Sequence, residues 1–64
     1  MTKKEDEILE QFAKPEEIFD LRSRLNLSQF QFAVELGTNP TSVCRWENGK
    51  AKPEKYFRLK MAKL

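Results

Sequence analysis

Three polar side chains that can exchange hydrogen bonds with another molecule lie close together in the chain. Thr41 and Ser42 carry hydroxyl groups, and Arg45 follows within a helical turn of both. An arginine side chain presents two N–H donors that match the O6 and N7 acceptors of guanine in the major groove of DNA. Hydroxyl groups can bind either base edges or phosphates. Because spacings of three and four residues share one face of a helix, we predict a single hydrogen-bonding surface here.

The composition excludes most catalytic chemistry. The 64 residues contain no histidine and a single cysteine, Cys44. A Cys/His zinc site, a disulfide within the chain and a Ser-His or Cys-His nucleophile therefore cannot form. No glycine-rich phosphate loop is present either, since the chain has only two glycines. We expect a binding protein that is not an enzyme and that holds neither a metal nor a cofactor.

Length and charge restrict the class further. The chain is long enough for one small domain. Its longest unbroken apolar run is 32–34, too short to span a membrane, and it lacks an apolar leader, so we expect a cytoplasmic protein. Residues 1–20 carry seven acidic and three basic side chains, whereas residues 21–64 carry nine basic and three acidic ones. This asymmetry favours a polyanion as the partner of the basic part.

Glycine, proline and capping residues divide the chain into short helices. No stretch alternates as a strand would, so we predict an all-α bundle of four to five helices, with its domain at 15–64. The acidic extension 1–14 is predicted to form a short helix, because Thr2 and Glu5 have the spacing of a capping box. The later helices are expected to begin at Pro15, after Ser28, near Pro40 under a Thr38 or Asn39 cap, and at Pro53. Their expected ends are Asn26, Gly37, Asn48-Gly49 and Leu64.

The two central helices, over residues 29–48, have the pattern of a helix-turn-helix. Gly37 between them accepts the positive φ that a tight turn requires. Ala33 is small enough to let the second helix cross the first closely. Val43 and Trp46 provide an inward apolar face on the second helix, so its polar residues face outward. A helix divided in this way is what reading the major groove requires.

These residues resemble the XRE-type helix-turn-helix family, which includes phage repressor and Cro proteins, restriction–modification controller proteins and many antitoxins. The resemblance covers roughly residues 17–64 and depends on the segments Ser28–Gly37 and Ser42–Lys50 together with Pro53. Those segments contain the Ser-Gln that opens the first motif helix and the Trp-Glu-Asn-Gly that closes the second. The fold that the resemblance implies is a phage-repressor-like helical bundle.

The resemblance also implies a role for each matching position. The family reads base edges from the positions that are occupied here by Thr41, Ser42 and Arg45. Arg22 and Glu47 lie where many members form an internal ion pair. Gln29 lies where the family binds a backbone phosphate and braces a side chain of the recognition helix. Further phosphate contacts are implied at Asn39, Asn48, Lys50 and Lys52.

Two functions remain open at this stage. The first is a sequence-specific regulator of transcription that binds double-stranded DNA, most simply a repressor that occludes a promoter by placing residues 40–47 in the major groove. One such module buries little surface, so we expect a homodimer on a pseudo-palindromic operator. The two copies can come together on the DNA itself. The alternative is a protein-binding module, such as an antitoxin or co-regulator, that docks a protein partner through the acidic N-terminal segment.

Overall fold

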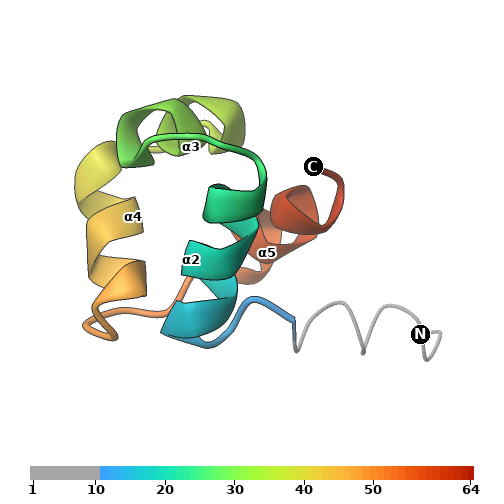
Figure 1. Ribbon diagram of the computed structural model, residues 1–64. Coiled ribbons are helices and arrows are strands. Elements are labelled where there is room, and N and C mark those ends of the chain that lie inside the picture. The colour runs from blue at the N-terminus through green and yellow to red at the C-terminus, as the bar shows by residue number, and fades with distance from the viewer. Residues whose placement is uncertain (1–10) are drawn as a thin grey trace, which may run out of the picture.

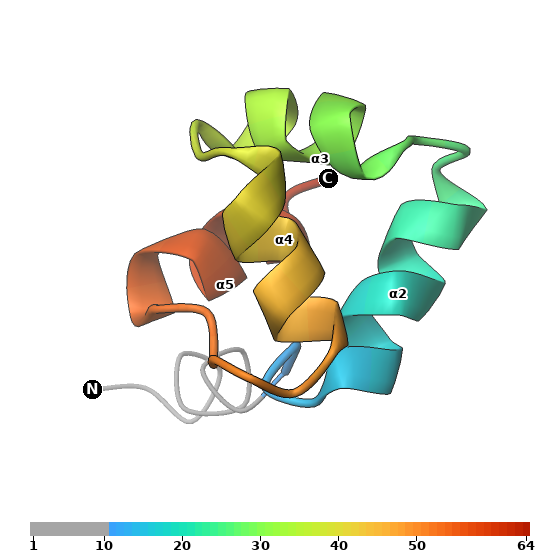
Figure 2. The same cartoon turned by 90° about the vertical axis from the view of Figure 1, so that its left-hand side faces the viewer.

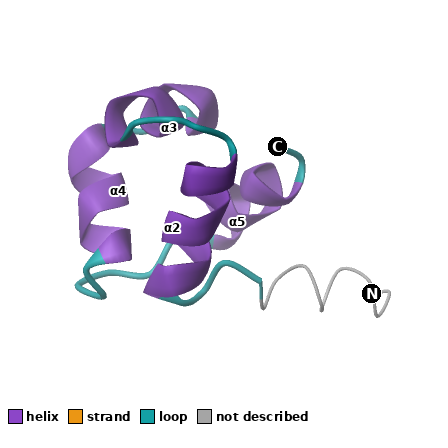
Figure 3. Ribbon diagram, viewed as in Figure 1, coloured by secondary structure: helices purple, strands orange, loops and turns teal. Residues whose placement is uncertain are grey.

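The computed structural model describes residues 11–64, which form four helices around one core (Figure 1). No strand occurs in this part of the chain, so the predicted all-α class is confirmed (Figure 3). None of the described helices is long and apolar enough to cross a membrane. The helices are α2 (Pro15–Arg24), α3 (Gln29–Leu36), α4 (Pro40–Glu47) and α5 (Lys55–Ala62).

Capping residues fix where the two central helices begin. At the start of α3, Ser28 Oγ accepts the backbone N–H of Gln31 at 3.0 Å, and Gln31 Oε1 accepts the backbone N–H of Ser28 at 2.9 Å. This reciprocal pair is a capping box. At the start of α4, Asn39 Oδ1 accepts the backbone N–H of Ser42 at 2.9 Å. Of the two caps predicted for α4, Asn39 is therefore the one that acts.

Helices α2, α3 and α4 end in the same way. Asn26, Gly37 and Gly49, which follow α2, α3 and α4, have φ values of 57°, 77° and 74°. The next backbone N–H then returns to the carbonyl five residues earlier, from Leu27 to Arg22 at 3.2 Å, from Thr38 to Ala33 at 2.9 Å and from Lys50 to Arg45 at 2.9 Å. This left-handed residue followed by a six-to-one hydrogen bond is the Schellman motif. The predicted end of each of these helices is confirmed.

Replacing Gly37 by alanine is expected to lower stability by about 1–2 kcal/mol, because a Cβ is disfavoured at positive φ. Space is not the cause, since a Cβ there would meet only Lys60 Nζ, at an ordinary 3.5 Å. Thermal unfolding followed by circular dichroism measures the loss. Gly37→Asn is the matched control, because asparagine tolerates this conformation and should lose less. Equal melting temperatures for the two variants would contradict the backbone explanation.

The last helix departs from the prediction at both ends. It begins at Lys55 rather than Pro53, because Glu54 keeps extended backbone angles (φ −67°, ψ 158°) and forms the N-cap. Pro53 is instead buried against the rest of the domain. The helix ends at Ala62 and does not continue to Leu64. Proline favours the first helical turn, but here packing places it just before the helix.

The predicted N-terminal helix falls largely outside the described residues, and residues 11–14 are not helical. Within that described stretch Phe12 is partly buried and packs against the core. Of the acidic extension, the structure therefore describes only residues 11–14, which lead into α2.

The core lies where the four helices meet. Figure 2 shows α4 flanked by α5 and α2, with α3 across one end of the three. Phe32 and Phe30 of α3 illustrate how the core selects its members, because Phe32 is 0% exposed and Phe30 is 64% exposed. Residues two positions apart cannot share one helix face. Besides Pro53, the buried side chains are those of the core, namely Ile18, Leu21, Phe32, Ala33, Leu36, Val43, Trp46 and Met61.

Candidate nucleic-acid interface

The side chains of α4 separate into a buried face and an exposed face. Val43 and Trp46 are 0% and 5% exposed. Thr41 and Arg45 are exposed, and Ser42 is half-buried. The predicted division of this helix is confirmed, because burial of two residues three apart leaves the residues at 41 and 45 on the opposite side. The exposed face offers a hydroxyl and a guanidinium group to a ligand in solvent.

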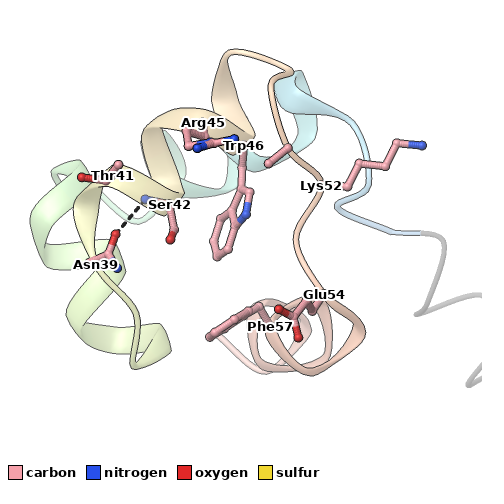
Figure 4. Close-up of a pocket in the computed structure, with 9 residues that line it drawn as sticks. Asn39, Thr41, Ser42, Arg45, Trp46, Lys52, Glu54 and Phe57 are labelled. Atoms are coloured by element: carbon pink, nitrogen blue, oxygen red, sulfur yellow. Dashed lines mark hydrogen bonds between the residues drawn. The ribbon is translucent and has the colours of Figure 1, made fainter.

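A groove runs between α4 and the segment that leads into α5 (Figure 4). Trp46 and Phe57 contribute to its apolar surface, with ring centroids 5.4 Å apart. In Figure 4 the Lys52 side chain points away from α4. The groove brings together five of the eight residues predicted to contact DNA, namely Asn39, Thr41, Ser42, Arg45 and Lys52.

The other predicted contacts lie elsewhere on the surface. Gln29 and Asn48 line a separate depression, which they share with Arg22 and Glu47. Lys50 lines neither hollow and is exposed in the loop after α4. Its backbone N–H donates to the carbonyl of Arg45 at 2.9 Å, which fixes the loop against the end of the helix. The phosphate-contact set implied by the resemblance is therefore spread around α4 rather than gathered in one hollow.

Sequence reasoning did not identify Glu54 as part of this surface. Its carboxylate lines the groove across from α4, beside Phe57 (Figure 4). A carboxylate there repels phosphates and can accept a hydrogen bond from the amino group of cytosine. The available signal was its isolation, because Glu54 is one of three acidic residues in 21–64 and directly follows a loop with two lysines.

Arg22 and Glu47 form the ion pair that the resemblance implied. Arg22 Nε donates to Glu47 Oε2 at 2.7 Å and Nη2 donates to Oε1 at 3.0 Å. Arg22 Nη1 also donates to the carbonyl of Leu27 at 3.0 Å. The two charged side chains are only 16% and 7% exposed. This bidentate pair joins α2 to the last residue of α4 and thus fixes the end of the helix that carries the exposed polar face.

The hydrogen bond with Glu47 raises the pKa of Arg22, partial burial lowers it, and the negative charge of Glu47 raises it further. The net effect is a pKa above the ordinary value of an arginine. A raised pKa stabilises the folded state at every pH below the unfolded value, and this contribution is lost only as the pH rises through the folded value. Arg22 is therefore fully protonated, and its contribution to stability is fully present, around neutral pH.

Gln29 contacts the same carboxylate from α3. Its Nε2 donates to Glu47 Oε1 at 3.3 Å. The brace that the resemblance implied for Gln29 is thus present, and it acts on the final residue of α4. Glu47 consequently joins three helices, because Arg22 belongs to α2 and Gln29 to α3. The contact of Gln29 with a phosphate stays a prediction.

Two asparagines of the predicted set already have intramolecular partners. The side-chain oxygen of Asn39 caps α4, as described above, and Asn48 Nδ2 donates to Cys44 Sγ at 3.2 Å. Both asparagines are exposed. Asn39 therefore keeps its amide N–H groups for an external acceptor such as a phosphate.

Comparisons with protein-family models, with curated proteins and with solved structures found no significant match to this chain. The XRE-type family thus stays a resemblance based on the residues around the turn. The site itself is defined by its geometry. An exposed polar face on α4 lies beside a groove, and Glu47 fixes the end of that helix.

Proposed function

We propose that this protein is a sequence-specific transcriptional regulator that binds double-stranded DNA by placing residues 40–47 of α4 in the major groove. The observation that carries the proposal is the exposed face of α4 with Thr41 and Arg45, on a helix whose other face is buried in the core. Base reading needs hydrogen-bonding groups held on a rigid element. The ion pair of Arg22 with Glu47 supports that rigidity at the end of the helix.

Arg45 is assigned the main reading role. Its guanidinium can form two hydrogen bonds with guanine, a pattern that no other base pair offers in the major groove. Thr41 and Ser42 line the same groove as Arg45. Their hydroxyl groups are assigned to base edges next to that guanine.

Phosphate contacts orient the helix and supply affinity that does not depend on sequence. The charge of the C-terminal part suits this role, because residues 37–64 contain seven lysines and arginines against two glutamates. The residues assigned to phosphates are Gln29, Asn39, Asn48, Lys50 and Lys52.

Regulation would be steric on this proposal. A protein bound over a promoter excludes the polymerase, so the simplest outcome is repression. One small module buries limited surface, and useful affinity requires two copies on half-sites about 34 Å apart. The protein acts by binding alone and needs neither a catalytic step nor a cofactor.

Selection of bound duplexes from a randomised DNA library at physiological salt tests the proposal directly. We expect a short pseudo-palindromic motif with guanine at one position of each half-site. The protein must be shown to be helical by circular dichroism in the same buffer. Recovery of no motif by the folded protein would contradict the proposed function.

Affinity for DNA is expected to fall steeply with salt, with a slope of about −0.9 for each phosphate neutralised. Lys50→Ala and Lys52→Ala should each weaken binding to all sequences alike and reduce the slope by about 1. Titrations of labelled duplex at several salt concentrations measure this. Lys63→Ala is the matched control, because the C-terminal end lies on the far side of the molecule from α4 (Figure 1). One common slope for the three variants would remove the two lysines from the contact set.

A further inference from the structure

The outer side of α3 carries an apolar patch that the described part of the chain does not cover. Phe30 and Val34 are 64% and 60% exposed. Because they are four positions apart, they form one stripe along the helix. With the half-buried Leu27 they line a shallow depression, bordered by Gln31 and Glu35. Neighbouring apolar side chains exposed in this way are typical of an interaction surface.

The border of the patch offers one hydrogen-bond donor and one charged acceptor. Gln31 Oε1 accepts the backbone N–H of Ser28, which leaves Nε2 to donate to another molecule. Glu35 carries the only charge on α3, and no cation of the described residues pairs with it. Since the two residues are also four positions apart, they lie along one side of the stripe.

We propose that a second copy of this chain covers the patch, in a two-fold contact between antiparallel α3 helices. A two-fold axis brings each end of the stripe against the opposite end of the stripe on the second copy. Phe30 of each copy therefore packs on Val34 of the other. The same axis places Gln31 Nε2 beside Glu35 of the second copy. The donor and the acceptor therefore complement each other twice, on one side of the apolar contact.

This contact rests on the proposed function in one respect, which is that two copies must bind one operator. The patch shares no residue with the groove beside α4, so the reading faces of both copies stay free. Stable interfaces bury about 800 Å² on each partner, and a stripe along one short helix offers much less. We therefore expect weak association in solution, which two adjacent half-sites strengthen by raising the effective concentration.

Sedimentation equilibrium without DNA, over about 0.05–1 mM protein, tests the contact. The average mass of the natural sequence is expected to rise from 7.6 kDa toward twice that value. The double variant Phe30→Ser/Val34→Ser should remain a monomer throughout. Tyr56→Ser is the matched control, because Tyr56 of α5 is similarly exposed at 58% and should not affect association. All three replaced side chains are at the surface, and circular dichroism confirms that the variants fold.

A natural sequence that stays monomeric up to about 1 mM would overturn the proposal. Unchanged association of the double variant would also overturn it, and loss of association in Tyr56→Ser would place the contact on α5 instead. Association through α3 without selective DNA binding would support this contact and contradict the proposed function. Operator binding by a protein that never associates would do the opposite.

Discussion

Replacing Glu47 by alanine is expected to lower the free energy of unfolding by about 3 kcal/mol. The variant leaves the Arg22 guanidinium, only 16% exposed, without its carboxylate. It also removes the acceptor of Gln29 Nε2. We take the lower end of the range for buried pairs because Arg22 keeps some contact with water. Domains of this size have only a few kcal/mol of net stability, so a substantial unfolded fraction should be visible.

Urea unfolding at micromolar concentration, followed by circular dichroism, measures the Glu47 effect. Glu35→Ala is the matched control, because Glu35 is exposed on α3 and its loss should cost less than about 0.5 kcal/mol. Glu47→Gln keeps the size of the side chain and removes its charge, so its midpoint should fall between the two alanine variants. Equal midpoints for Glu47→Ala and Glu35→Ala would show that the ion pair does not stabilise the domain.

Arg45→Ala is expected to abolish discrimination at one base pair of each half-site, a loss of about 1–3 kcal/mol. Stability should not change, because Arg45 is exposed and forms no ion pair with any described residue. Fluorescence anisotropy with the selected operator, and with duplexes changed at one base pair at a time, measures the effect. Only the duplexes altered at the guanine contacted by Arg45 should become equivalent to the operator.

Two further substitutions separate base reading from simple charge. Arg45→Lys keeps the positive charge but cannot form the two parallel hydrogen bonds, so discrimination should fall while the salt dependence stays similar. Arg24→Ala removes an arginine of α2 that is exposed and contacts Asp20 at 3.4 Å, and it should leave discrimination intact. An even loss of affinity on all duplexes in Arg45→Ala would assign Arg45 to a phosphate instead of a base.

Local signals account for much of the fold. The caps at Ser28 and Asn39 and the left-handed residues Gly37 and Gly49 predicted where α3 and α4 begin and end. These features depend on hydrogen bonds between residues only a few positions apart. The start of α5 was predicted wrongly because Pro53 suits the first turn of a helix equally well, and its burial against the domain was not visible locally.

The sequence by itself determined that the domain is helical, where its central helices end, and that α4 carries its polar side chains opposite its apolar ones. Backbone hydrogen bonding and helical periodicity are local, so residue types and spacing suffice for them. Only the tertiary structure decided that Gln29 reaches Glu47, eighteen positions away, and that Glu54 faces α4 across a groove. Such outcomes depend on how helices cross, which is set by packing of the whole core at once.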